Sequence, residues 1–291
     1  MRSLVQLELY KIFRKPRTYI AFGVITALVV IMQIGFYLDG ETFIDFAMQP
    51  LRNSFVLEGN IMNGYFMCFM ILQLLLIHVP ILIALVSGDM VSGEAGMGTL
   101  RLLLTKPISR TGFLFSKFFA ASVYTLLLLI WMAFLGLAVS LMIFGGDDLV
   151  VFKSEVVTFI LEDDVLWRYG VTFAFALLAM LTVASLAFML SVFAENSIGP
   201  IVTTVCIIIL FTIFSTIDIP VFQSIRPFLF TSHMLAWKGF FDVQVNAANE
   251  AIVGSIEQVP ALLTSAGVLV LHIAAFLGIG TYTFQKKDIL S

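Results

Sequence analysis

Six long apolar segments, separated by polar ones, dominate the pattern of this chain. A helix needs about 20 predominantly apolar residues to cross about 30 Å of hydrocarbon, and each segment is of that order. The pattern predicts an all-α integral membrane protein with six transmembrane helices in a single transmembrane domain, residues 1–291. The expected spans are residues 18–38, 63–86, 113–144, 168–194, 198–217 and 260–284, of which the third is long enough to tilt or to project beyond the bilayer.

The composition points to the same class. Apolar residues make up 60% of the chain and charged residues 12%, with a mean hydropathy of +1.04. Soluble domains contain about half apolar and about a quarter charged residues. No polar run is long enough to form an independent soluble domain, so one membrane domain accounts for the chain.

The distribution of charge predicts an orientation. With both termini in the cytoplasm, the inner side holds eleven of the sixteen basic residues and five of the nineteen acidic ones, a net charge of +6. The outer side then holds five basic and fourteen acidic residues, a net charge of −9, and the two sides sum to −3. The excess of Lys and Arg favours this orientation, and the acidic outer side argues against nucleic-acid binding.

Residues 2–17, before the first span, have the pattern of an amphipathic helix. Val5, Leu9, Ile12 and Phe13 fall on one face, and Glu8, Lys11 and Lys15 fall on another. Such a helix is expected to lie in the headgroup plane at the membrane surface. The first span exceeds the usual hydrophobic region of a signal peptide, so we expect this segment to be retained.

The polar loop between the second and third spans, residues 92–117, contains a short helical pattern. Leu100, Leu103 and Leu104 recur at positions i, i+3 and i+4. The spacing predicts a helix over residues 99–105 with one apolar stripe, which Pro107 would end. This small amphipathic helix would lie at the inner face of the membrane.

The same loop resembles the first cytoplasmic loop of ABC-2 type transporter permeases. The resemblance lies in Glu94, then Gly98-Thr99-Leu100 and a leucine run, then Lys106-Pro107-Ile108-Ser109-Arg110. It implies a permease subunit of an ATP-binding cassette exporter in the inner (plasma) membrane. The implied partners are two copies of a separate ATPase subunit and a second permease protomer, identical or related.

The resemblance also implies roles for individual residues. The loop helix would be a coupling helix, in which leucines fill a groove on the ATPase while charged side chains orient the loop by ion pairs. The turn between the fourth and fifth spans is a second candidate contact by its position alone. The candidate coupling residues are Glu94, Gly98, Thr99, Leu100, Arg101, Leu103, Leu104, Lys106, Pro107, Arg110, Glu195 and Asn196. In the alternative interpretation, the loop is solvated and its leucines pack on their own bundle.

Two further features fit the ABC-2 type fold. The N-terminal helix stands where such permeases carry an amphipathic helix beside the ATPase contact, although a simple basic anchor for the first span remains the alternative. Residues 218–259 are long and only partly polar. The resemblance implies a re-entrant segment there, before the last span, that serves as an outer gate.

Motifs for chemistry are missing from the sequence. It has no G-x-x-x-x-G-K-[ST] phosphate loop, no H-E-x-x-H and no G-x-S-x-G. We therefore expect no enzymatic activity and no cofactor in this chain, with ATP and Mg bound by the partner ATPase. The acidic cluster of Glu162, Asp163 and Asp164 leaves two interpretations open, a cation site or solvated acids that enforce topology.

Two other function classes remain open. An ion-gradient-driven secondary transporter or channel would place ionisable groups at mid-membrane, where the spans offer little beyond His78 and His272. An ATPase-linked envelope assembly subunit would have an ATPase partner, as the exporter permease does, but it would move no small substrate. Co-purification of an ATPase would separate the secondary transporter from the other two.

Overall fold

The computed structural model describes residues 2–48, 61–105, 108–152, 157–246 and 251–287. Six of its helical segments are long and apolar enough to cross a membrane. The prediction of an all-α, multi-pass membrane protein is confirmed at this level. The six segments are Pro16–Gly40, Gly64–Gly96, Arg110–Phe144, Glu162–Phe193, Ile198–Thr216 and Val259–Lys286.

The first half of the chain forms three of these segments and two helices outside them, one at each side of the first two segments. α1 (Arg2–Arg14) precedes α2 (Pro16–Met48), which is kinked at Asp39. Next come α3 (Gly64–Ser87), α4 (Ser92–Gly96) and α5 (Thr99–Leu104). The third segment is overlong, as predicted, and consists of α6 (Arg110–Ala133), a π-helical turn η1 (Phe134–Val139) and α7 (Ser140–Phe144).

The second half begins with an antiparallel hairpin of β1 (Leu149–Phe152) and β2 (Val157–Ile160), which the sequence did not predict. α8 (Glu162–Phe193) starts six residues before the predicted span, and α9 (Ile198–Thr216) follows it. Short elements lead to the last helix, α12 (Val259–Lys286). They are α10 (Pro220–Ile225), η2 (Arg226–Phe228), α11 (Phe230–Met234) and η3 (Leu235–Phe241).

Local sequence explains several helix starts. The side chain of Asn63 accepts a hydrogen bond from the backbone N–H of Phe66 (2.9 Å), and that of Ser109 accepts one from Gly112 (3.1 Å). Each caps an otherwise unpaired N–H in the first turn of α3 or α6. Pro220 stands at the first position of α10, where a proline costs no hydrogen bond.

α8 is the central helix of the bundle and packs against α3, α6, α9 and α12. Its buried residues include many small ones, which let neighbouring backbones approach closely. Examples are Ala176, Ala179, Ala184, Ser185 and Ala187. On the facing side of α12, a Cβ on Gly280 would lie 3.6 Å from the Cα of Met189.

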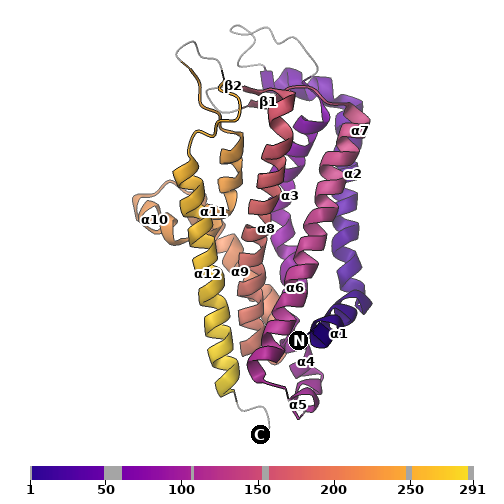
Figure 1. Cartoon of the computed structure of the whole chain (residues 1–291), viewed down its shortest axis with the longest axis vertical. Coiled ribbons are helices and arrows are strands. Elements are labelled where there is room, and N and C mark those ends of the chain that lie inside the picture. Colours follow the sequence, from indigo (N-terminus) through magenta and orange to yellow (C-terminus); the bar gives the residue numbers. More distant parts are fainter. Residues whose placement is uncertain (1, 49–60, 106–107, 153–156, 247–250, 288–291) are drawn as a thin grey trace.

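The two ends of the bundle are built from different elements (Figure 1). One end, here called the basal end, contains α1, α4, α5, the turn between α8 and α9 and the last turn of α12. The β1–β2 hairpin marks the other end, here called the hairpin end. α10 projects from the side of the bundle between the two ends.

Candidate functional site

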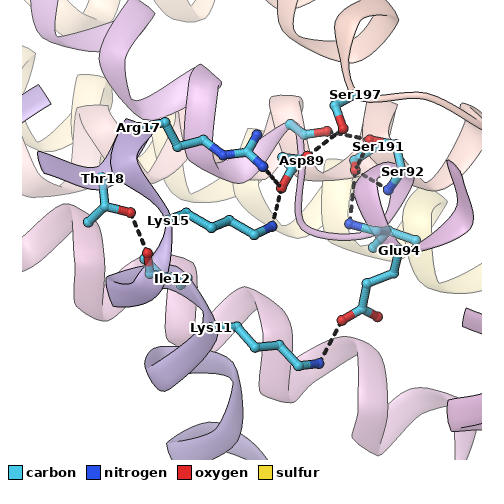
Figure 2. A network of polar contacts seen from close by, with 12 residues as sticks. Lys11, Ile12, Lys15, Arg17, Thr18, Asp89, Ser92, Glu94, Ser191 and Ser197 are labelled. Atoms are coloured by element: carbon cyan, nitrogen blue, oxygen red, sulfur yellow. Dashed lines mark hydrogen bonds and ion pairs between the residues drawn. The ribbon is translucent and has the colours of Figure 1, made fainter. Parts of the chain in front are cut away.

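The candidate site is a network of polar contacts at the basal end, shown in Figure 2. In Figure 2 the network joins α1 and the start of α2 to the loop after α3, and this loop to the turn between α8 and α9. Ion pairs of Lys117 add α6 to it. These elements are far apart in sequence, and the ion pairs span up to 109 residues. The network therefore fixes how the loop of residues 88–98 sits against the rest of the bundle.

The first part of the network surrounds Lys117 on α6, whose side chain is 1% exposed. Its Nζ lies 2.8 Å from Oε2 of Glu8 on α1 and 2.8 Å from Oε1 of Glu94 on α4. Lys11 contacts the same two carboxylates, at 2.8 Å from Glu8 and 2.7 Å from Glu94. Two carboxylates and two ammonium groups thus compensate one another where water is largely excluded.

The second part centres on Asp89, which follows α3. Its Oδ2 lies 2.6 Å from Nζ of Lys15 and 2.6 Å from a terminal nitrogen of Arg17. Its Oδ1 accepts a hydrogen bond from the hydroxyl of Ser197, in the turn between α8 and α9. Asp89 therefore connects the junction of α1 and α2 to the second basal turn.

Uncharged hydrogen bonds attach the loop to α8. The Oγ of Ser191 accepts from the backbone N–H groups of Val91 (3.1 Å) and Ser92 (2.9 Å). The Ser191 hydroxyl donates to Oγ of Ser92 (3.1 Å), and that of Ser92 donates to the carbonyl of Gly88 (2.7 Å). All these bonds are buried, so the polar groups at the start of α4 have hydrogen-bond partners from the protein rather than from solvent.

The electrostatics of the first part favour the charged forms. Burial raises the pKa of Glu8, but the charge of Lys117 and hydrogen bonds from Lys11 and Lys117 outweigh it and hold the pKa below its ordinary value. Burial lowers the pKa of Lys11, but hydrogen bonds to Glu8 and Glu94 and their charges raise it above its ordinary value. Both groups are therefore ionised in the docked state of α1.

This arrangement corrects one expectation from the sequence. The sequence pattern places Glu8 with Lys11 and Lys15 on the polar face of the N-terminal helix, yet Glu8 is 4% exposed. It lies one turn before Ile12, which is also buried, so α1 turns both residues toward α6. The helix itself is present but ends at Arg14, three residues before the predicted end.

The helix predicted over residues 99–105 is present as α5, Thr99–Leu104, and its leucines have different environments. Leu100 is 3% exposed and packs in the core of its own chain, and Leu103 is partly buried against that core. The alternative interpretation, in which leucines pack on their own bundle, thus describes Leu100. The exposed apolar side chains of this region are Met97 (64%) and Leu102 (70%).

Three other candidate residues shape the loop around α5. Gly98 has φ of +71°, a left-handed conformation that favours glycine, directly before α5. The Thr99 hydroxyl donates to the carbonyl of Glu94 (3.3 Å). Arg101 is exposed on α5. Lys106, Pro107 and the side chain of Leu104 lie outside the described residues.

Arg110 does not join the network. Its guanidinium donates to backbone carbonyls at the end of α12, of Gln285 (3.0 Å) and Lys287 (2.9 Å). It therefore caps that helix, where a cation is also favoured by the helix dipole. The structure thus gives Arg110 a bonding pattern different from the predicted ion pair within the loop.

Glu195 and Asn196, the candidates in the second basal turn, are both exposed beside the loop. A Cβ on Gly96 would lie 2.9 Å from the backbone carbonyl oxygen of Glu195, so only glycine lets α4 approach this turn so closely. The Asn196 side chain accepts a hydrogen bond from the backbone N–H of Gly199 (3.1 Å) and caps α9. The two predicted contact regions therefore form one continuous basal surface.

Sequence analysis did not select Glu8, Lys11, Asp89 or Lys117 as site residues. A signal was present for Lys117, because it falls inside a predicted span, where a charge requires a partner. The partners themselves could not be paired by spacing, since Glu8 and Glu94 come from separate segments. Among the described residues, no group of three or more His, Cys, Asp or Glu is placed to hold a metal ion.

The hairpin end has a different polar centre, Arg168 on α8, which is 0% exposed. It binds Oδ2 of Asp164 (2.6 and 3.2 Å), and it donates to the carbonyls of Phe240 (2.6 Å) and Ser255 (2.7 Å). Trp167 donates to the other oxygen of Asp164 (2.6 Å). Asp164 is thus buried and ion-paired to an arginine, so neither of the two interpretations, a cation site or a solvated acid, describes this residue.

A protein-family model matches residues 19–290 of the chain. The chain belongs to the family described as protein of unknown function (DUF2705). The match covers all or nearly all of each of the six apolar segments of this DUF2705 chain, together with Asp89, Glu94 and Lys117, whereas α1 with Glu8 and Lys11 precedes it. The comparison with curated proteins found no match.

Proposed function

We propose that the chain is the permease subunit of an ATP-binding cassette exporter of the ABC-2 type. In this proposal the basal end faces the cytoplasm, both termini are cytoplasmic, and the protein resides in the inner (plasma) membrane. Two copies of a separate ATPase subunit bind ATP and Mg and dock on the basal end. A second permease protomer, identical or related, completes the transporter.

The observation that carries the proposal is the way the basal loop is attached. Through Glu94 and Asp89, the loop is ion-paired to α1, α6 and the start of α2, and through Ser191 it is bonded to α8. A displacement of a segment attached in this way moves the attached helices, because packed interiors do not deform continuously. The basal loop would therefore move as one rigid body with the helices to which it is attached, and not as a flexible connection.

The surface offered to the ATPase would consist of exposed basal side chains. Met97 and Leu102 supply apolar area, and Arg101, Glu195 and Asn196 supply polar groups around them. Apolar anchors within a polar rim are the usual anatomy of a protein interface. Leu100 would act indirectly, by holding α5 against the bundle.

Transport would follow from alternating access. ATP binding closes the ATPase pair and displaces α4 and α5, and the attached α3 and α6 change the opening between protomers. The short elements α10, η2, α11 and η3 would form the re-entrant outer gate, which Arg168 holds to α8 through Phe240 of η3. The chain itself would do no catalysis.

The proposal is tested by affinity purification of the tagged chain from its native membrane in a mild detergent. We expect an ATP-hydrolysing subunit to co-purify. The double variant Met97→Asp/Leu102→Asp should lose that subunit while remaining folded, because both side chains are exposed. Leu161→Asp is the matched control, since Leu161 is 51% exposed but adjoins the hairpin at the opposite end.

Two results would contradict the proposal. One is the absence of an ATPase from the purified wild-type chain, at detergent concentrations that keep the protein monodisperse. The other is equal retention of the ATPase by the basal variant and by the Leu161 control. Replacing Leu100 would be a weaker test, because burying an aspartate there would damage the fold itself.

A further inference from the structure

The place where α1 meets α2, residues 7–20 and here called the basal corner, is rich in cations. Four of its residues are basic, namely Lys11, Arg14, Lys15 and Arg17. The first apolar segment begins within it, at Pro16, so the basal corner lies at one surface of the membrane. In Figure 1, α1 lies at the base of the bundle and α2 at its edge. Basic clusters beside a transmembrane helix attract anionic lipid headgroups.

Backbone contacts hold the basal corner in one shape. The Thr18 hydroxyl donates to the carbonyl of Ile12, and both residues are buried. The backbone N–H of Lys15 donates to the same carbonyl (3.1 Å), and that of Thr18 donates to the carbonyl of Lys15 (3.1 Å). The basic side chains therefore extend from a fixed turn, which lowers the entropic cost of binding a ligand.

Asp89 does not neutralise the two cations that meet it. Lys15 and Arg17 each place a nitrogen 2.6 Å from the same oxygen, Oδ2, of Asp89, as Figure 2 shows. One negative charge thus stands against two positive ones that repel each other. Both basic side chains are about one-third exposed, and the guanidinium of Arg17 has further N–H groups beyond the nitrogen at Asp89. A second anion on the exposed side would relieve the repulsion.

Arg14 adds a cation without a carboxylate partner among the described residues. Its guanidinium carbon lies 4.8 Å from the centre of the Tyr10 ring, and both side chains are exposed. With Arg14 included, the basal network and the basal corner hold five cations and three carboxylates. The surplus of positive charge is complementary to a phosphate, which guanidinium groups bind through paired hydrogen bonds.

The exposed face of the basal corner is not the face that water favours. Leu7 (43%) and Tyr10 (56%) are exposed on α1, whereas the charged Glu8 is 4% exposed. Tyr19 (59%) and Ile20 (56%) continue the exposed apolar surface at the start of α2. Contact with a lipid surface would bury this apolar area, and aromatic side chains are favoured at the level of the headgroups.

We infer that the basal corner binds an anionic phospholipid, with Arg14, Lys15 and Arg17 around the phosphate and with Leu7 and Tyr10 beside the acyl chains. The inference goes beyond the proposed function and needs only a chain that spans a membrane. The bound lipid would compensate the second cation at Asp89. It would thereby hold α1, α2 and the basal loop together.

Thermal unfolding of the purified full chain in an uncharged detergent tests the inference. Phosphatidylglycerol should raise the Tm, because a ligand that binds the folded state stabilises it, and the effect should weaken with salt. Phosphatidylcholine with the same acyl chains, which has no net charge, should not raise it, and neither should inorganic phosphate. Equal shifts with the two phospholipids would overturn the inference. An equal shift with inorganic phosphate would also overturn it, because the occupant would then be a soluble anion.

Variants locate the site. A basic residue near an anionic lipid surface contributes a factor of about five, so Arg14→Gln should raise the Kd for phosphatidylglycerol about fivefold and Arg14→Gln/Arg17→Gln about 30-fold. Arg14→Gln breaks no ion pair of the described residues, so it keeps the test valid if the double variant is unstable. The control is Lys286→Gln/Lys287→Gln, which removes two charges at the basal end of α12, where Lys286 also lies over a tyrosine ring (4.2 Å). Equal losses in both double variants would overturn the inference.

A nitroxide label reports the medium around α1. The background is Cys206→Ser, because Cys206 is exposed, whereas Cys68 is buried. In vesicles of phosphatidylcholine and phosphatidylglycerol, a label at Leu7→Cys should collide more often with oxygen than with a water-soluble nickel chelate. A control label at Met97→Cys should show the reverse, since Met97 is 64% exposed at the same end. A Leu7 label as accessible to the chelate as the Met97 label would overturn the inference.

Affinity purification separates this inference from the proposed function. If phosphatidylglycerol binds at the basal corner but no ATPase co-purifies, the lipid site stands and the exporter proposal fails. If Arg14→Gln loses the ATPase while its response to phosphatidylglycerol stays that of the wild-type chain, a protein occupies the basal corner and the lipid site is wrong.

Discussion

The two ends of the bundle solve the problem of buried charge in different ways. At the hairpin end, one arginine, Arg168, is fully buried and satisfied by a single carboxylate and two backbone carbonyls. At the basal end, Glu8, Asp89 and Glu94 share four cations, three of which have side chains that are about one-third exposed. At the hairpin end a single cation makes all the contacts, whereas at the basal end each carboxylate contacts two cations, so the contacts are redundant.

This difference suggests a division of labour. Loss of Arg168 leaves Asp164 without its cation and the carbonyls of Phe240 and Ser255 without their donor, so Arg168 holds the outer segment in one position. A basal cation can be lost while its carboxylate keeps another, so the basal contacts can break and reform as the loop moves. In the proposed transporter, the redundant end is the one that receives force.

The largest effect is expected from Arg168→Met. The variant leaves Asp164 buried without its cation and leaves the carbonyls of Phe240 and Ser255 unpaired. Removing one partner of a buried pair costs about 3–5 kcal/mol. We expect a clear fall in Tm in detergent, with Arg168→Lys recovering only part of it because an ammonium cannot reproduce the guanidinium geometry. An unchanged Tm would contradict the description of the hairpin end.

Lys117→Met should rank second. It removes the one fully buried cation of the basal network, but Lys11 still contacts both Glu8 and Glu94. We expect a loss of about 2–3 kcal/mol, below the full cost of an unpaired buried charge. Hydrogen exchange should show loss of protection in α1 first. Equal loss in α1 and α12 would mean that Lys117 stabilises the whole bundle and not the basal contact.

Acidification should weaken the docking of α1 on the bundle, with a smaller effect than Lys117→Met. Because the pKa of Glu8 is lowered from its ordinary 4.5, its contribution is complete above that value and is lost as pH falls through the lowered pKa. Because the pKa of Lys11 is raised from 10.5, its contribution is complete below that value and is lost as pH rises through the raised pKa. Docking of α1 should therefore be strongest between these limits.

Protease sensitivity of the first 14 residues, measured across pH, checks this window. The matched control is Glu8→Gln, which should be more sensitive at neutral pH and should respond less to acid. If the protease sensitivity of the wild-type chain does not change on acidification well below pH 4.5, then Glu8 does not stabilise the docking of α1.

The smallest effect is expected from Lys15→Met. Its Nζ contacts Asp89, but the side chain is 35% exposed and Asp89 also binds Arg17 and Ser197. Partly exposed ion pairs contribute about 0–1 kcal/mol. We expect a change of Tm near the error of measurement. A loss as large as that of Lys117→Met would show that the basal network is not redundant.

The sequence was sufficient for the main architecture. Six apolar segments are visible by length alone. The ends of the segment formed by α6, η1 and α7, and those of α9 and α12, agree with the predicted spans within a few residues. The basal helix α5 was visible from its leucine spacing and from Pro107. These features depend on local composition, which a single sequence contains.

The rest depended on contacts between distant segments. The burial of Glu8 and its pairing with Lys117 across 109 residues require the packing of α1 on α6. The burial of Leu100, the capping of α12 by Arg110 and the pairing of β1 with β2 are of the same kind. Spacing within a segment predicts which face a residue occupies, but it does not say which other segment covers that face.

The central claim is that the basal end receives force from a cytoplasmic ATPase, and the sidedness of Leu102 tests it most directly. In a Cys206→Ser background, Leu102→Cys should react with a membrane-impermeant maleimide in inside-out vesicles and not in intact cells. Leu161→Cys, beside the hairpin, should show the reverse. Labelling of Leu102→Cys from outside intact cells would contradict the account, because no cytoplasmic motor could then reach this surface.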